Sequence, residues 1–241
     1  MVNRHLFKVF VVFSIVLLAL LAPRFGGFIA DQFSYGRFDP DGVFAWLYVH
    51  HIVQALLIGL LMWFITRRTG LRFGLGIGEV GIGIRYVKRF ALYFLIYTVV
   101  VLSIMTMLGG VMTMHFPLTA RNVVGYLSFQ LFMSGPSEEL IFRAFVMTLG
   151  GFFIKTRLLG GRLSAVNLLA ALVFVVAHIG FSFSPFSLSY EPMQLLYSFA
   201  LGIIYGACYE RTKSVYYPMM LHSISNVISV SAVMVVQVLF G

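Results

Sequence analysis

The chain has 241 residues, of which 60% are apolar and only 10% are charged, and its mean hydropathy is +0.96. Soluble domains carry about 25% charged residues, so this composition excludes an ordinary soluble protein and indicates an integral membrane protein. The net charge of +9 does not indicate nucleic acid as a partner, because the cations gather at the ends of apolar runs, and the single cysteine, Cys208, excludes an internal disulfide or a thiol cluster.

Apolar runs long enough to cross the bilayer recur along the whole chain. About 20 helical residues cross about 30 Å of hydrocarbon. The runs are 7–22, 44–66, 90–108, 123–154, 163–179, 193–209 and 217–240. Pro23 lies where a signal peptidase would have to cut after Ala22 and disfavours that cleavage, so we predict that the first run is a membrane helix. The sequence predicts an all-α, polytopic transmembrane helix bundle of about seven spans.

The polar segments between the runs predict the orientation of the bundle. With the N-terminus in the cytoplasm, thirteen Lys and Arg residues fall on the inner side and three, Arg24, Arg37 and Arg121, on the outer side. Residues 23–42 are rich in Gly, Asp and Pro and are expected to form an external loop. Residues 67–89 are basic and alternate Gly with Ile or Leu, which is compatible with an interfacial hairpin or with a re-entrant segment.

Few ionisable side chains lie inside the runs. Each needs a partner or a function, because a charge at the centre of a membrane helix costs about 2.5 to 3.5 kcal/mol. Glu139 and Arg143 are four residues apart and can form a buried ion pair on one helix face. Glu138 is turned by about 100° from Glu139 and can point into a cavity. We expect His50 and His51 to be structural, hydrogen-bonded groups.

Two more pairs that contain a histidine have helical spacing. Phe174 and His178 share one face of the fifth run, and His222 and Asn226 share one face of the seventh. Three helices therefore each present one polar face to an apolar bundle, which predicts a single buried site.

These segments resemble the motifs of a known family. The sequences EELIFR (138–143), FVVAH (174–178) and HSISN (222–226) look like the EExxxR, FxxxH and HxxxN motifs of the CAAX prenyl protease and bacteriocin-processing (CPBP, or Abi) family of intramembrane proteases. The stretch 202–222 also resembles the link between the last two core helices of that family. The resemblance covers about residues 125–235, so we divide the chain into helices without a motif (1–122) and a protease-like core (123–241).

The resemblance implies a glutamate-dependent intramembrane endopeptidase that needs no metal and no other cofactor. It implies that Glu138 and His178 activate a water molecule and that His222 and Asn226 bind the oxyanion. Glu139, Arg143 and Phe174 would support these groups. The expected substrate is a prenylated CAAX-type protein or another membrane-bound peptide, and the expected location is the inner cell membrane, with the lipid bilayer as the other partner.

Two alternatives remain open at this level. A zinc protease could use Glu138, His178 and His222 as ligands, although the HExxH signature is absent. A non-enzymatic scaffold or bacteriocin-immunity protein could use the same cavity for binding. One geometric difficulty also remains: His222 lies about 8 Å and Glu138 about 24 Å from the cytoplasmic ends of their helices. They can meet only if the helices are tilted, staggered or broken, and Gly135 with Pro136 offers a place for a break.

Overall fold

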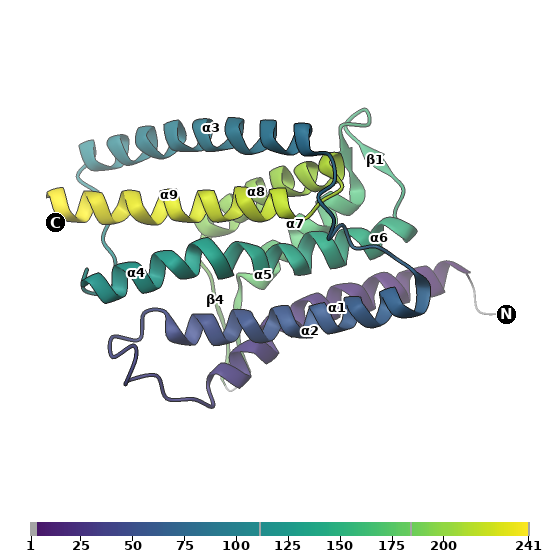
Figure 1. The fold of residues 1–241 in the computed structure, drawn as a ribbon, viewed down its shortest axis with the longest axis horizontal. Coiled ribbons are helices and arrows are strands. Elements are labelled where there is room, and N and C mark those ends of the chain that lie inside the picture. The colour runs from purple at the N-terminus through teal and green to yellow at the C-terminus, as the bar shows by residue number, and fades with distance from the viewer. Residues whose placement is uncertain (1–3, 111, 184, 241) are drawn as a thin grey trace.

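The computed structural model describes residues 4–110, 112–183 and 185–240. In these residues the helices form seven runs that lie side by side in a bundle (Figure 1), which confirms the all-α class. The runs are α1 (Arg4–Ala30), α2 (Ala45–Thr69), α3 (Val80–Met107), a composite run from α4 to α6, α7 (Ala165–Ala177), α8 (Pro192–Thr212) and α9 (Tyr216–Phe240). Helices α1, α2, α3 and α9 are long and apolar enough to span a membrane, and α7 is a shorter apolar helix. The protein is an integral membrane protein.

The composite run contains the two glutamates and alternates between α-helical and π-helical turns. It consists of α4 (Ala120–Phe129), η1 (Gln130–Ser134), α5 (Gly135–Glu139), η2 (Leu140–Met147) and α6 (Thr148–Phe153). The helical run continues through Pro136, which has no backbone N–H to donate, and hydroxyl groups donate to carbonyls near it. Ser223 Oγ donates to the Leu131 carbonyl at 2.8 Å, and Ser137 Oγ donates to the Ser134 carbonyl at 3.2 Å.

Helix α1 is longer than the apolar run 7–22 from which we predicted it. It continues through Pro23 to Ala30, so the expected external loop begins at residue 31 instead of residue 23. The added turns pack closely on α2: a Cβ on Gly26 would lie 2.7 Å from the carbonyl oxygen of His50. This close contact with α2 explains why the glycine-containing segment 23–30 is helical and belongs to α1.

The segment 67–89 forms neither a hairpin nor a re-entrant structure. Helix α2 ends at Thr69, and Gly70 takes the left-handed conformation that commonly ends a helix. Residues 70–79 then run along the α8–α9 connection, where Val215 N–H donates to the Gly74 carbonyl and Glu79 N–H to the Thr212 carbonyl, both within 2.9 Å. Helix α3 starts at Val80, ten residues before the predicted span, so its first three turns carry the basic residues.

Two small antiparallel hairpins complete the described fold. The strands β1 (Arg157–Leu158) and β2 (Leu163–Ser164) pair after α6, and β3 (Gly180–Phe183) and β4 (Phe186–Ser189) pair after α7. The loop 31–44 lies at one end of the bundle, and the β1–β2 connection lies at the opposite end, which is also the end where α1 starts (Figure 1).

The main apolar core joins the two parts into which we divided the sequence. One cluster contains Ile15 and Ala19 of α1, Ile58 of α2, and Phe142 and Phe145 of η2. The helices without a motif thus pack directly on the segment that carries the glutamates, and the boundary at 122/123 stays a sequence prediction.

Candidate active site

Glu138 lies in α5, between the π-helical segments η1 and η2. Such π-helical turns are wider than α-helical ones and are frequent at functional sites. Its side chain is 18% exposed. One carboxylate oxygen, Oε1, lies 4.0 Å from His51 Nδ1, and the other, Oε2, lies 3.8 Å from His222 Nε2. Both separations exceed a direct hydrogen bond and suit attraction between charges or a bridge through one water molecule. The carboxylate is therefore flanked by two imidazole rings from α2 and α9.

Glu139 is fully buried and connects two cationic groups. Its Oε1 atom accepts a hydrogen bond from Arg143 Nη1 at 2.9 Å and lies 2.9 Å from His222 Nδ1. Because a carboxylate paired with arginine only accepts hydrogen bonds, His222 Nδ1 must carry the proton of that bond. The expected Glu139–Arg143 pair is present, and Glu139 also fixes the orientation of the His222 ring, so that Nε2 faces Glu138.

Arg143 is held inside the bundle by three further contacts. Its Nη2 donates to the carbonyl of Gly202 on α8 at 3.0 Å, and its guanidinium lies over the rings of Phe174 and Tyr205, at 5.0 and 5.4 Å from the ring centroids. A Cβ on Gly202 would lie 3.2 Å from Ala171 Cβ, so glycine allows α8 to approach this closely. Arg143 thus ties α5, α7 and α8 together around Glu139.

Two aromatic rings enclose His222. The ring of Tyr205 stacks on it, with a centroid distance of 5.0 Å and an interplanar angle of 24°, and Phe174 meets it edge-on at 5.8 Å. The Tyr205 hydroxyl shares a 2.6 Å hydrogen bond with Ser225 Oγ. This packing restricts the imidazole to one plane between the two glutamates.

His178 caps the C-terminus of α7 and contacts Phe174, which in turn contacts His222. Its Nδ1 lies 2.8 Å from the Phe174 carbonyl oxygen, and its ring packs edge-on against the Phe174 ring at 4.7 Å. The bond to a carbonyl places the proton on Nδ1, which leaves Nε2 as an acceptor in the neutral ring. His178 has no carboxylate within 4.0 Å among the described residues, so the structure does not bring it into direct contact with Glu138.

Asn226 lies one turn beyond His222 on α9, as its spacing predicts. Its Nδ2 donates to Ser134 Oγ at 3.0 Å, and Ser134 ends the π-helical segment before α5. The amide therefore lies on the side of the site nearest the start of α5.

The stagger of α9 removes the geometric difficulty raised by the sequence. Helix α9 begins inside the bundle, short of the end where α6 lies (Figure 1). A residue two turns into α9 therefore lies level with the middle of the composite run. His222 and Glu138 meet without a break at Pro136.

His51 is hydrogen-bonded, as expected, and also lies beside Glu138, a position that the sequence did not predict. It is buried on α2, where its Nδ1 lies 2.7 Å from Ser137 Oγ and 2.9 Å from Gln54 Nε2, and Gln54 also donates to Ser137 Oγ at 2.9 Å. The His51 to Gln54 spacing of three, which puts two polar groups on one face of α2, was the available signal.

The described part of the chain contains no group of three or more His, Cys, Asp or Glu side chains placed to hold a metal ion. The zinc alternative requires Glu138, His178 and His222 to converge on one point. Among the described residues His178 has no carboxylate within 4.0 Å, and the Phe174 ring packs against both His178 and His222. Metal independence stays a prediction from the family resemblance.

The fold and the site define a polytopic membrane protein with a buried cluster of carboxylates and imidazoles. Residues 120–228 match the family of type II CAAX prenyl endopeptidase Rce1-like proteins. The match contains all three motifs and confirms the resemblance predicted from them. No curated protein and no solved structure matches the chain.

Proposed function

We propose that this protein is a glutamate-dependent intramembrane endopeptidase in which Glu138 is the general base. One observation carries the proposal. The Glu138 carboxylate is partly buried between His51 and His222, while the adjacent Glu139 is fully buried and already used by Arg143 and His222. Of these two glutamates, only Glu138 has no direct hydrogen bond to another side chain of the described residues, which leaves its carboxylate able to take a proton from water.

In the proposed reaction a water molecule attacks the carbonyl carbon of the scissile bond. Glu138 accepts the proton that leaves this water, and His178 helps to orient the water through its free Nε2 atom. The resulting oxyanion is stabilised by Asn226 Nδ2 and by His222 Nε2, which donates when the ring is an imidazolium. Glu138 then returns the proton to the amine nitrogen as the C–N bond breaks, leaving a new carboxylate and a new amine.

His222 faces both glutamates, which supports its place beside the oxyanion. Its Nδ1 atom is hydrogen-bonded to Glu139 Oε1 at 2.9 Å. Its Nε2 atom lies 3.8 Å from Glu138 Oε2 and is the ring atom that points toward the proposed base.

The experiment compares the new peptide termini in cell membranes carrying the wild-type protein and its variants, by mass spectrometry. Glu138→Gln is the test, and Glu79→Gln, an exposed glutamate before α3, is the matched control. We expect termini that are present with the wild type and the control and absent with Glu138→Gln. Identical termini for all three proteins at equal levels would reject proteolysis and favour the scaffold or immunity alternative.

The same experiment identifies the substrate class. The family description supports a prenylated CAAX-type substrate, which we propose as the first candidate. Termini three residues from the end of prenylated proteins would support it, whereas termini in other membrane-bound precursors would assign a different substrate to the same chemistry. Adding a chelator in parallel tests the zinc alternative, since a glutamate-dependent enzyme keeps its activity.

A further inference from the structure

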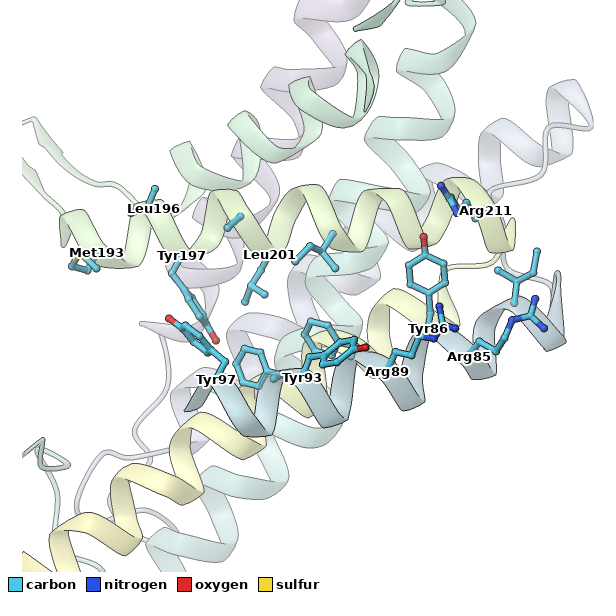
Figure 2. A pocket seen from close by; sticks show the side chains of 15 residues that line it. Arg85, Tyr86, Arg89, Tyr93, Tyr97, Met193, Leu196, Tyr197, Leu201 and Arg211 are labelled. Carbon is cyan, nitrogen blue, oxygen red and sulfur yellow. The ribbon is translucent and has the colours of Figure 1, made fainter. Parts of the chain in front are cut away.

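A large groove lies between α3 and α8, away from the candidate active site. It has a volume of about 910 Å³ and is lined by residues of α3 from Ile82 to Tyr97 and of α8 from Met193 to Arg211 (Figure 2). Leu201 lines this α3–α8 groove, whereas the next residue, Gly202, accepts the hydrogen bond from Arg143. One layer of α8 therefore separates the groove from the buried glutamates, and the catalytic proposal does not use it.

One end of the groove is strongly cationic. Arg85 and Arg89 of α3 and Arg211 of α8 line it, and all three are exposed (Figure 2). Within the described residues none of these arginines has a carboxylate within 4.0 Å. Glu210, the acidic neighbour of Arg211 in sequence, is paired with Arg157 and bonded by Ser164. Three guanidinium groups are thus available to an anion at this end.

The rest of the groove is apolar and aromatic. Tyr93 and Leu196 are 66% and 62% exposed, and Phe90, Phe94, Tyr97 and Tyr197 continue the lining. Figure 2 shows Tyr97 and Tyr197 close to one another at the end away from the arginines. A flexible hydrocarbon chain can cover such a surface, and a polar ligand would gain little from it.

The length of the groove corresponds to one leaflet of a membrane. Arg85 and Tyr97 are twelve residues apart on α3, which is about 18 Å at 1.5 Å per residue. Half of the hydrocarbon core of a bilayer is about 15 Å thick. A molecule with its charge at the arginines therefore has room for one chain along the helices before it reaches the membrane centre.

We propose that the α3–α8 groove is a binding site for an anionic phospholipid. The phosphate is bound by Arg85, Arg89 and Arg211, which provide planar, charge-assisted hydrogen-bond donors, and one acyl chain lies along the aromatic lining. Basic pockets between membrane helices are suited to anionic headgroups in this way. The inference does not depend on the proposed proteolysis.

Native mass spectrometry of the full-length protein in detergent tests the proposal. The probes are phosphatidylglycerol and phosphatidylcholine that carry the same two oleoyl chains, added singly and together. The variants are Arg85→Gln/Arg89→Gln/Arg211→Gln and a control with equal charge loss, Arg67→Gln/Arg68→Gln/Arg72→Gln, in which three exposed cations at and just after the end of α2 are removed. Ala200→Trp, which fills the apolar part of the groove, tests the acyl chain separately.

We expect the wild type and the control to prefer phosphatidylglycerol by roughly tenfold or more, as several cation contacts predict. The groove variant should lose this preference, and Ala200→Trp should weaken binding of both lipids. Equal binding of both lipids by the wild type, or an equal loss of preference in the control, would overturn the proposal. A farnesylated peptide provides a further test. If it displaces the lipid and binds the arginine variant with the same affinity as the wild type, the proposal is overturned and the groove is assigned to the tail of a substrate.

Discussion

Two adjacent glutamates in this protein have different surroundings and therefore different chemistry. Glu139 is fully buried and accepts hydrogen bonds from Arg143 and His222, whereas Glu138 is partly exposed and faces two imidazoles at 3.8 and 4.0 Å. Glu139, which is bonded to Arg143 and His222 through one oxygen, fits a structural role, and Glu138, which faces two imidazoles without a direct hydrogen bond, fits a chemical one.

Replacing each glutamate by glutamine should therefore affect activity and stability differently. Glu138→Gln is expected to abolish cleavage and to leave thermal unfolding close to that of the wild type. Glu139→Gln is expected to destabilise the protein by about 3 to 5 kcal/mol, because it leaves Arg143 buried without a counter-charge. Thermal melts in detergent and the cleavage assay together decide. Full activity in Glu138→Gln, or an unaltered melt in Glu139→Gln, would contradict the assignment.

His51 is expected to position Glu138 from the side of α2. Because it contacts Ser137 and lies 4.0 Å from the carboxylate, His51→Gln should lower kcat about tenfold with little change in KM, and should move the pH profile of kcat. His50→Gln, at a ring that stacks on His51 and packs on Trp46, is the control and should retain the wild-type profile. A loss of kcat at unchanged pH dependence in both variants would indicate general packing damage instead.

At the scale of elements, the composite run from α4 to α6 presents the glutamates to α9. Gly135 makes this approach possible: an added Cβ would lie 2.9 Å from the backbone nitrogen of Ser223 and 3.1 Å from His222 Cβ. The π-helical turns on both sides of α5 set the direction in which residues 138 and 139 point. The position of His222 relative to Glu139 thus depends on the helix contact at Gly135.

Gly135→Ala should displace α9 and with it His222. Displacements near 1 Å at a catalytic group can cost about 100-fold in rate, so we expect a loss of ten- to 100-fold in kcat/KM. Gly151→Ala in α6 is the matched control, because nothing lies within 4 Å of the added Cβ. Equal activity in the two variants would show that the close approach of α9 is not needed.

The start of α2 depends on an aspartate in the preceding loop. Asp39 is buried, which raises the pKa of its carboxyl group, but hydrogen bonds from the N–H groups of Ala45, Val43 and Phe44 and the charge of Arg121 outweigh burial and lower that pKa below the usual 3.8. Because the folded pKa lies below the unfolded one, this stabilisation is present above about pH 4 and is lost as the pH falls through the folded pKa.

Asp39→Ala should therefore destabilise the protein at pH 7 by about 1 kcal/mol, the usual value for a lost helix cap. The difference from the wild type should shrink as the pH is lowered below the folded pKa. Thermal unfolding in detergent at pH 7 and at a series of acidic pH values measures both effects. A difference that does not change with pH would assign the loss to packing around residue 39.

At the scale of the whole molecule, the two ends of the bundle differ in charge. The start of α1 and the β1–β2 connection lie at one end and the loop 31–44 at the other (Figure 1), and most Lys and Arg residues belong to the first end. The positive-inside rule then predicts that the α1 end is cytoplasmic. The orientation decides from which side a substrate and the lipid headgroup reach the protein.

Cysteine labelling with a membrane-impermeant maleimide on intact cells tests this orientation. Cys208 is fully buried, so it should give no background. Ser34→Cys in the loop should be labelled, and Thr156→Cys before β1 should be labelled only after the membrane is opened. The reverse pattern would invert the proposed topology.

The sequence by itself determined the membrane class, the seven helical runs and the three polar faces, because apolar length and helical spacing are local properties of the chain. It did not determine that α1 continues to Ala30 or that α3 begins at Val80. Glycine disfavours a helix locally, and these glycines are helical because neighbouring helices pack closely on them. Gly83, for example, lies against the ring of Tyr217. Only the tertiary structure placed His51 beside Glu138 and packed the His178 ring against Phe174. Residues far apart in the chain meet through the stagger of α9 and the packing of α2, which no spacing in one segment encodes.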